Sequence, residues 1–185
     1  MLKSGEVIAF KTDTVWGFGC DPLDRIAVDK IYEIKNRDSK KPLILMSDNI
    51  ESLKKYIKFI PDYANDLIEK YLPGALTLIF EKSDACPDFI TSNGNTVGIR
   101  IPNSEDFRKI IANVEGKVLA TTSCNVSNEK PVMNYFEACG KFSDVATIIK
   151  PICDIENENV PSTVILCQKD GYKILRQGAI ELWKN

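Results

Sequence analysis

Short apolar runs and helically spaced apolar positions alternate along the chain. A short apolar run between turn residues predicts a strand, and apolar side chains that recur every three or four residues predict a helix with one face on a core. The predicted strands cover residues 6–10, 43–46, 76–80, 97–101, 117–121, 145–149, 163–166 and 172–175. The predicted helices have their apolar positions within residues 23–34, 50–57, 63–71 and 107–114.

Capping residues mark the ends of two of these helices. Asp21 and Pro22 suit the cap and the first turn of the first helix, which is expected to carry Lys35 and Arg37 at its C-terminal end. Ser104 suits the cap of the last helix, because its hydroxyl can accept a hydrogen bond from a free backbone N–H of the first turn.

The order of the elements predicts the fold class. Strands interleave with helices, and Asp170-Gly171 between the last two strands is the strongest hairpin signal in the chain. We therefore expect an α/β fold built on a twisted mixed sheet with flanking helices. Because the chain has 185 residues, no repeat and no long linker, residues 1–185 are expected to form a single domain, with residues 157–161 as a surface loop.

Composition and charge exclude several classes of protein. Hydrophobic residues make up 44% and charged residues 27%, as in ordinary globular proteins. No apolar run is long enough to span a bilayer, so a soluble, cytoplasmic protein without a membrane partner is expected. The 24 basic and 26 acidic residues give a net charge of -2, which argues against a domain that coats nucleic acid.

The chain has no histidine and six widely spaced cysteines. The commonest general base and the commonest transition-metal ligand are therefore absent, and no protein metal site is expected. Without a Cys-x-x-Cys pair, the cysteines are expected to be reduced thiols. The chemistry must rest on lysine, arginine, hydroxyl, amide and carboxylate groups, or on Mg²⁺ that enters with a nucleotide.

Three polar segments lie at the ends of predicted elements. Residues 11–19 follow the first strand, where α/β folds bind ligands, although a polar turn is the simpler explanation for this segment alone. Residues 35–41 form a basic cluster that is either a solvated helix end or a triphosphate clamp. Residues 121–125 offer small donors and acceptors for a ribose, a phosphate or an amino-acid head group. Cys124 within them is expected to have a packing role, because no histidine can activate its thiol.

Read in chain order, these segments and four others match the motifs of one known family. Residues 12–17 resemble its Pro-Thr-Glu-Thr-Val-Tyr-Gly loop, Lys35-x-Arg37 its Lys-x-Arg signature, and Ser123-x-Asn125 its Ser-x-Asn signature. The other matches are residues 73–77 with Pro-Gly-Pro-x-Thr, 96–102 with Thr-Val-x-Val-Arg-x-Pro, 161–164 with Pro-Ser-Thr-Val, and 175–178 with Leu-Arg-x-Gly. The chain therefore resembles the threonylcarbamoyl-AMP synthase family, which implies a YrdC-like fold.

The chain departs from the family pattern at a few positions. Lys11 stands where proline is usual, Asp13 replaces a glutamate, and Met46 occupies a place that is histidine in many members. Residues 128–133 depart from the usual Ser-Gly-x-x-Ser continuation, so no nucleotide contacts are expected there by analogy.

The resemblance implies a nucleotidyltransferase that makes threonylcarbamoyl-AMP and pyrophosphate from L-threonine, bicarbonate and ATP with Mg²⁺. Partner proteins would pass the threonylcarbamoyl group to a tRNA adenosine. Such phosphoryl chemistry rests on positioning and charge neutralisation, which lysine, arginine and Mg²⁺ supply without histidine.

The resemblance also implies a role for particular residues. The residues expected around the reacting phosphate and carbamate, as catalytic and ATP-binding groups, are Lys35, Arg37, Ser123 and Asn125. Thr96 and Arg176 are expected on the nucleotide, and Thr12, Arg100 and Ser162 on the threonine side. Asp13 has two possible roles at this stage, to assist Mg²⁺ or to hold a basic residue in place.

Two other functions compete with this interpretation. An enzyme of the same fold makes carbamoyl-adenylate from carbamoyl phosphate, but there the similar domain lies within a much longer chain. A binding module for double-stranded RNA or ribosome precursors is the other alternative, and the net charge of -2 argues against it.

Overall fold

A computed structural model describes residues 2–38, 40–154 and 160–182. The strands are β1 (Ile8–Phe10), β2 (Gly17–Cys20), β3 (Ile44–Met46), β4 (Leu76–Glu81), β5 (Thr96–Arg100), β6 (Leu119–Ser123), β7 (Thr147–Ile148), β8 (Thr163–Gln168) and β9 (Gly171–Arg176). The helices are α1 (Arg25–Lys35), α2 (Ile50–Lys54), α3 (Asp62–Tyr71), α4 (Glu105–Ala112) and α5 (Tyr135–Phe142), with a 3-10 turn at Glu115–Lys117.

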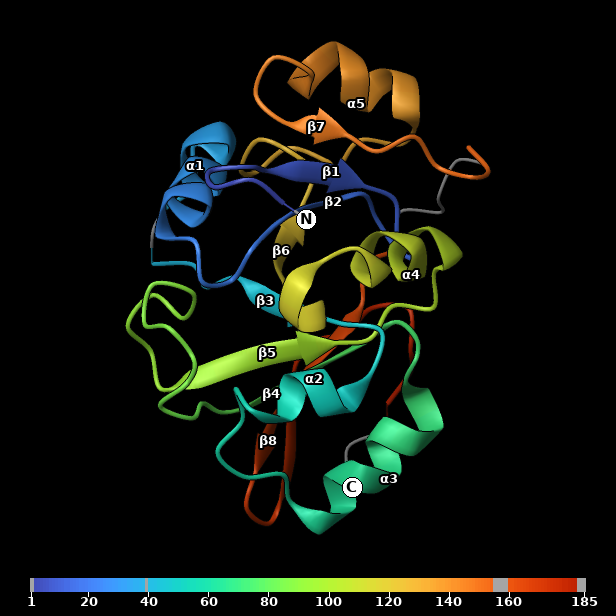
Figure 1. Ribbon diagram of the computed structural model, residues 1–185. Helices are drawn as coiled ribbons and strands as arrows, with labels where there is room; N and C mark the ends of the chain where they lie inside the picture. Colours follow the sequence, from blue (N-terminus) through green and yellow to red (C-terminus); the bar gives the residue numbers. More distant parts are fainter. Residues whose placement is uncertain (1, 39, 155–159, 183–185) are drawn as a thin grey trace.

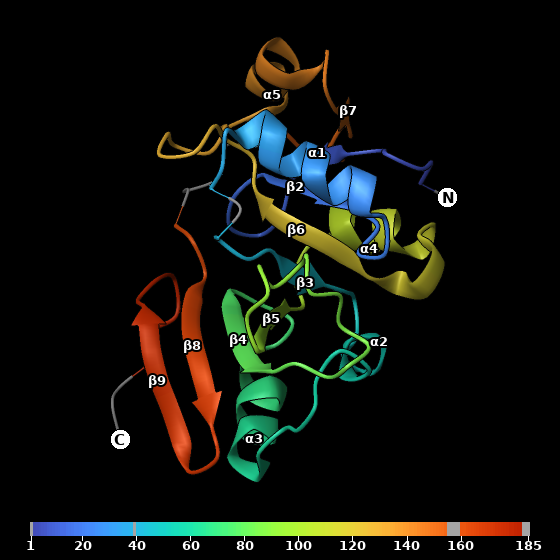
Figure 2. The same ribbon diagram turned by 90° about the vertical axis from the view of Figure 1, so that its left-hand side faces the viewer.

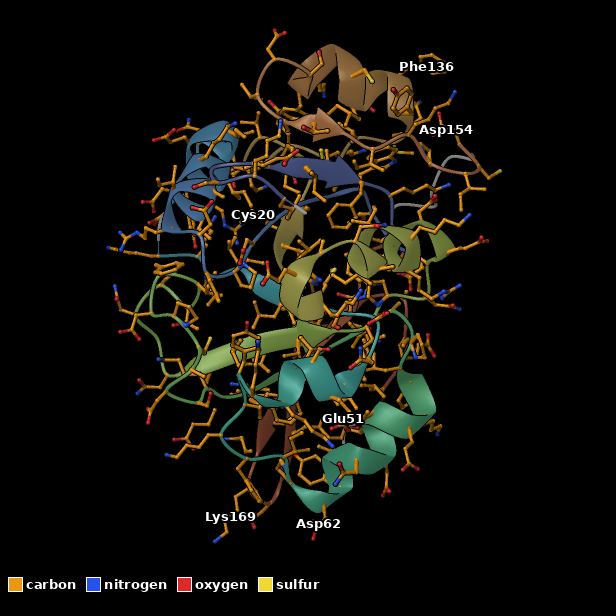
Figure 3. The ribbon with its side chains drawn as sticks, in the orientation of Figure 1. Cys20, Glu51, Asp62, Phe136, Asp154 and Lys169 are labelled. Atoms are coloured by element: carbon orange, nitrogen blue, oxygen red, sulfur yellow. The ribbon has the colours of Figure 1, made fainter. Side chains whose placement is uncertain are left out.

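The strands form one nine-stranded mixed sheet in the order β7-β1-β2-β6-β3-β5-β4-β8-β9. Three neighbouring pairs are parallel, β1 with β7, β3 with β5 and β4 with β8, and the other pairs are antiparallel. The predicted α/β class with a mixed sheet and flanking helices is therefore confirmed. The β8–β9 hairpin and α5 lie at opposite ends of the molecule (Figure 2), as do the side chains of Lys169 and Phe136 (Figure 3).

The two faces of the sheet are covered unequally. One face packs on a large core that takes buried side chains from α1, α2, α3 and α5. The other face has a small core under α4, in which the Phe10 and Phe107 rings lie 5.5 Å apart. α1 and α4 accordingly lie on either side of β1, β2 and β6 (Figure 1). Beyond α4, the described residues form no large core on this second face.

Glycines in β2 let the small core form. Gly19 faces the Phe10 ring, and a Cβ at this position would lie 2.7 Å from Phe10 Cε1. A side chain there would displace the ring, so the Gly-Phe-Gly sequence allows Phe10 to lie flat on the sheet. β2 therefore lies partly within residues 11–19, where the sequence predicts a loop, because two glycines in a short strand remove the apolar signal.

The start of α1 also differs from the prediction. The helix begins at Arg25, and its cap is Asp24, whose carboxylate accepts hydrogen bonds from the N–H groups of Ile26 and Ala27. Asp21 and Pro22 therefore precede the helix. Leu23 and Ile26, which the helical spacing placed toward the core, are 63% and 67% exposed.

Other boundaries moved by a few residues. The predicted strand at 117–121 begins at Leu119, because the 3-10 turn with Gly116 at φ 72 precedes it. Ile57 lies beyond α2 and forms an isolated bridge with Lys82. α5 was not predicted at all. The β8–β9 hairpin is confirmed, with Gly171 at φ 154 as the first residue of its second strand. Of the expected loop at 157–161, residues 157–159 lie outside the described part of the chain.

Three further expectations were tested. Ser104 caps α4 as predicted, and its hydroxyl accepts a hydrogen bond from Phe107 N. The six cysteines are free, as expected. Among the described residues, no helix has the length and apolar character needed to cross a bilayer.

The cap of α1 gives the first prediction. Asp24→Ala should lower the free energy of unfolding by about 1 kcal/mol at pH 7, because two helix N–H groups lose their acceptor. The hydrogen bond from Gly5 N holds the pKa of Asp24 below its usual value. Its contribution is therefore fully present above the pKa of the unfolded chain and is lost as the pH falls below about 4.

Urea unfolding of both proteins at several pH values measures this difference. Asp29→Ala is the matched control, because Asp29 pairs with Arg25 in the same helix while both side chains are more than half exposed. It should change the free energy of unfolding by less than about 0.5 kcal/mol. Equal losses in the two variants would show that the cap contributes no more to the free energy of unfolding than an exposed ion pair does.

Candidate functional site

A cavity of about 450 Å³ opens on the sheet face that carries α4. Strand register explains its position, because residues paired across neighbouring strands point to the same face: Phe10 with Gly17, Ile44 with Gly98, and Val164 with Arg176. Its lining residues are Phe10, Thr12, Thr14, Val15, Gly17, Arg37, Pro42, Ile44, Met46, Thr77, Ile79, Arg100, Thr121, Thr122, Ser123, Pro131, Pro161, Ser162, Val164 and Arg176. The cavity therefore occupies the part of this face that α4 leaves open.

The lining is strongly positive and rich in hydroxyl groups. It includes Arg37, Arg100 and Arg176, and five threonines and two serines. Within the described part of the chain, none of the lining residues is acidic. Three guanidinium groups around one small cavity attract anions, and the hydroxyls supply neutral donors and acceptors.

Arg100 is the last residue of β5, and three hydrogen bonds hold its side chain in place. Its guanidinium donates to Asp13 Oδ1 at 2.6 Å, to Thr14 Oγ1 at 2.6 Å and to the Gly74 carbonyl at 3.0 Å. Burial lowers the pKa of Arg100, and the charge of Asp13 opposes that shift. The guanidinium stays charged because an arginine side chain does not lose its proton in proteins. Of the two roles left open for Asp13, the structure supports the second, since its carboxylate holds Arg100.

The turn that supplies Gly74 has little room. A Cβ at Gly74 would lie 2.5 Å from the Tyr71 carbonyl oxygen. The residue must be glycine for the chain to pass this close to the end of α3, and its carbonyl then points at Arg100.

Ser162 and Arg176 face the cavity from the C-terminal hairpin. Arg176 donates to the Ser162 carbonyl through Nε at 3.2 Å and through a terminal nitrogen at 2.8 Å. The Ser162 hydroxyl lies 2.8 Å from Thr77 Oγ1. A Cβ at Gly178 would lie 2.2 Å from the Pro161 carbonyl oxygen, so the chain after β9 folds closely over the start of β8. This fold brings Arg176 to the cavity.

Arg37 lies just beyond α1. The C-cap of this helix, Asn36, has the left-handed conformation with φ 46. Its guanidinium donates to the carbonyls of Lys41 and Pro42 at 3.3 Å and 3.2 Å. These two bonds use two of its five donors, and the side chain lines the cavity. Burial lowers the pKa of Arg37.

Lys35 lies beneath the cavity wall and is 0% exposed. Its ammonium donates to the carbonyls of Ser123 and Asn125 at 2.5 Å and 2.7 Å and to Asn125 Oδ1 at 3.1 Å. Burial, with a smaller contribution from the charge of Arg37, lowers the pKa of Lys35 to about 8. For Lys35 the interpretation as a solvated cation at a helix end is therefore wrong.

The structure thus divides the nine predicted site residues into three groups. Those that line the cavity are Thr12, Arg37, Arg100, Ser123, Ser162 and Arg176. Lys35 and Asn125 are buried next to it, and the Asn125 amide bonds Lys35, Val126 and Glu129. Thr96 is exposed at the far end of β5, on the same face as Arg100 but outside the cavity.

Several lining residues were not predicted as site residues. Met46 is 7% exposed and, together with Phe10, belongs to the small core that borders the cavity. Thr14 and Thr77 hold Arg100 and Ser162. Thr14 was detectable as the second hydroxyl of the loop after β1, whereas Thr77 lies inside an apolar strand and gives no signal of its own.

Two negative expectations bear on the chemistry. Among the described residues no group of three or more acidic or cysteine side chains is placed to hold a metal ion. Cys124 is buried, and burial raises the pKa of its thiol. A protonated, enclosed thiol is a poor nucleophile, which agrees with the packing role predicted for this residue.

Comparisons with known proteins show the family of this chain. The Sua5/YciO/YrdC family model, which carries the description "telomere recombination", matches residues 1–178. A threonylcarbamoyl-AMP synthase of Pyrococcus abyssi is 38% identical over 69% of this chain and 37% of its own length. One from Pseudoalteromonas translucida is 33% identical over 77% of each chain. The crystal structure of P. abyssi Sua5 complexed with L-threonine has a TM-score of 0.86 and 33% identity, over 94% of this chain and 51% of that one.

The clamp on Arg100 gives the second prediction. Asp13→Ala should lower the free energy of unfolding by about 3 kcal/mol, because it leaves a buried guanidinium without its counter-charge. The Arg100 side chain is 3% exposed and that of Asp13 is 15% exposed.

Urea unfolding at pH 7 measures the loss. Glu81→Ala is the control, because it breaks an ion pair of the same 2.6 Å length with Lys58 whose side chains are 57% and 63% exposed. The control should lose less than about 1 kcal/mol. If both variants lost the same amount, Asp13 would not be needed to compensate Arg100.

Proposed function

The chain belongs to the Sua5/YciO/YrdC family, and from this premise we propose its function. We propose that the protein joins L-threonine, bicarbonate and ATP into threonylcarbamoyl-AMP and releases pyrophosphate. The chain spans 37% of the Pyrococcus abyssi synthase, 51% of the chain in the P. abyssi Sua5 structure and 77% of the Pseudoalteromonas relative. The observation that supports the activity most directly is the acid-free cavity with three guanidinium groups.

The distribution of charge within the cavity suits two anionic substrates. Arg37 and Arg176 both line the cavity, and their hydrogen bonds within the described structure use only some of their N–H donors. Both residues are assigned to the triphosphate. Arg100 is assigned to the threonine carboxylate, next to the hydroxyls of Thr12 and Thr14. Ser123 and Ser162 offer hydroxyls between these two ends.

The proposed reaction has two steps. The neutral amine of threonine forms a bond to the carbon of bicarbonate and the C–OH bond breaks. The departing hydroxide takes a proton from the nitrogen and leaves as water, which gives an anionic carbamate. A carbamate oxygen then attacks the α-phosphorus of ATP, the bond to the bridging oxygen breaks, and pyrophosphate leaves with the electron pair. The attacking oxygen already carries a negative charge, so this step needs no protein base. The three arginines neutralise charge on the phosphates and the carboxylate.

Magnesium enters this proposal as part of the substrate Mg-ATP. The described residues offer no acidic cluster to bind a metal by themselves, and Asp13 is engaged by Arg100. The triphosphate and water would therefore provide most ligands of the ion. We also propose that the reaction takes place in the cytoplasm, and that other proteins pass the threonylcarbamoyl group to tRNA.

An assay with purified protein, Mg-ATP, bicarbonate and one amino acid tests this function. Pyrophosphate release should require all three substrates and should rank threonine above serine and serine above valine. Valine lacks the hydroxyl, and a site that hydrogen-bonds this group rejects such an analogue by about ten-thousand-fold. Serine lacks only the methyl, whose loss costs about 1 to 3 kcal/mol.

The product should be identified as an adenylate that carries labelled threonine. Pyrophosphate release at the same rate with valine would contradict the polar threonine pocket. Binding of double-stranded RNA without any nucleotide-dependent turnover would contradict the enzymatic proposal as a whole.

Arg37 gives a further prediction. Arg37→Ala should reduce kcat/KM for ATP by about a hundred- to a thousand-fold, the effect of losing one donor that stabilises charge in the transition state. The melting temperature should change little, because the guanidinium is only partly buried and bonds two carbonyls at the edge of the cavity.

Steady-state pyrophosphate release measures this effect. Arg108→Ala is the control, since Arg108 is an exposed arginine of α4 away from the cavity lining. It should keep the activity of the unchanged protein. A similar loss in both variants would mean that net charge, and not Arg37, determines the rate.

A further inference from the structure

Lys35 is buried in a way that leaves its ammonium no free donor for a substrate. Its side chain is among the largest fully buried ones in the described chain, and it does not line the cavity. An ammonium has three N–H donors, and three oxygen acceptors of Ser123 and Asn125 lie within hydrogen-bond distance. A phosphate could reach the ammonium only by displacing these two backbone carbonyls or the Asn125 side-chain oxygen.

The same lysine holds the following loop through its backbone. The Lys35 carbonyl accepts a hydrogen bond from Ser127 N at 2.7 Å. The two ends of Lys35 thus bind both the end of β6 and the segment that follows it, although about ninety residues of chain separate them. The end of α1 and the segment 123–127 therefore form one unit.

The loop is closed further by its own hydrogen bonds. The Asn125 amide donates to the carbonyls of Val126 and Glu129 at 2.7 Å and 3.1 Å. Val132 N returns to the Cys124 carbonyl at 3.0 Å. We define the loop wall as residues 123–132, and two of its members, Ser123 and Pro131, line the cavity.

We propose that Lys35 is a positioning residue, which fixes the loop wall and the direction of Ser123 from beneath and does not contact the triphosphate. The consequence for catalysis rests on the function proposed above, whereas the consequence for the loop does not. The Phe18 ring, 5.8 Å from the ammonium, adds a favourable contact for a buried cation. Arg37, two residues further on, is left as the cation of this motif that faces the cavity.

Hydrogen exchange of the nucleotide-free protein tests the structural part. Three amides of the loop wall are hydrogen-bonded: Cys124 N to the Trp16 carbonyl, Ser127 N to the Lys35 carbonyl and Val132 N to the Cys124 carbonyl. In Lys35→Met these amides should exchange at least about tenfold faster, while those of β4 and β5 stay unchanged. Lys30→Met is the matched control, because it removes a half-exposed lysine from the same helix. It should leave the loop wall as it is.

Kinetics test the catalytic part. If Lys35 positions the wall, Lys35→Met should lower kcat by about tenfold or more while the KM for ATP stays within about threefold, since Arg37 and Arg176 still hold the triphosphate. A large rise in the KM for ATP with unchanged exchange would show direct contact with the nucleotide and overturn the proposal. Unchanged exchange with unchanged kinetics would overturn it as well.

A second variant covers the case in which Lys35→Met does not fold. Asn125→Ala removes one acceptor of Lys35 and the two amide bonds within the wall, so it should also accelerate exchange there. In the double variant the two effects should not add, because both act on one hydrogen-bonded unit. Additive effects, or a protected wall in Asn125→Ala, would overturn the proposal. Absence of adenylate formation by the unchanged protein would remove the proposed function but not the exchange result.

Discussion

The site depends on the hydrogen bonds and the ion pair that compensate two buried cations beside the cavity. Arg100 and Lys35 are both almost fully enclosed, and a buried charge is costly unless polar groups compensate it. Arg100 is compensated by a carboxylate and two other oxygens, Lys35 by three oxygens of a single loop. Each cation thereby fixes segments that are far apart in sequence. The shape of the cavity follows from these two networks.

The sheet provides the space in which these networks work. One face is filled by a large core. In the part of the chain that the structure describes, the other face is covered by α4 and its small core alone, so part of it is open to a ligand. Gly98 lies between Ile44 and Ile79, and a Cβ there would lie 2.8 Å from Ile44 Cγ2. The floor beside the arginines is therefore smooth and apolar, and it contrasts with the charged and hydroxylic walls. A nucleotide or an amino acid needs both kinds of surface.

The proposed reaction does not require the histidine that this chain lacks. Transfer at the α-phosphorus by an anionic carbamate depends on charge neutralisation and alignment, and arginines held by fixed acceptors provide both at neutral pH. Asp13 and Thr14 both accept hydrogen bonds from the Arg100 guanidinium and so hold it in place. Neither residue needs to touch a reacting atom for this role. Polar residues such as Asp13 and Lys35 therefore lie outside the lining while they hold groups or segments that belong to it.

The sequence by itself determined the α/β class and most helices and strands, because periodicity is a local property of a chain. The family resemblance, carried by motifs along the whole sequence, indicated six of the residues that line the cavity. The sequence did not determine β2, whose glycines carry no apolar signal, or the start of α1, where Asp24 and not Asp21 is the cap. Only the tertiary structure distinguished Arg37, which faces the cavity, from Lys35, two residues earlier and buried. The sequence shows two cations on one basic segment. Which of them meets solvent depends on the carbonyls of Ser123 and Asn125, which reach Lys35 only when β6 and α1 pack together.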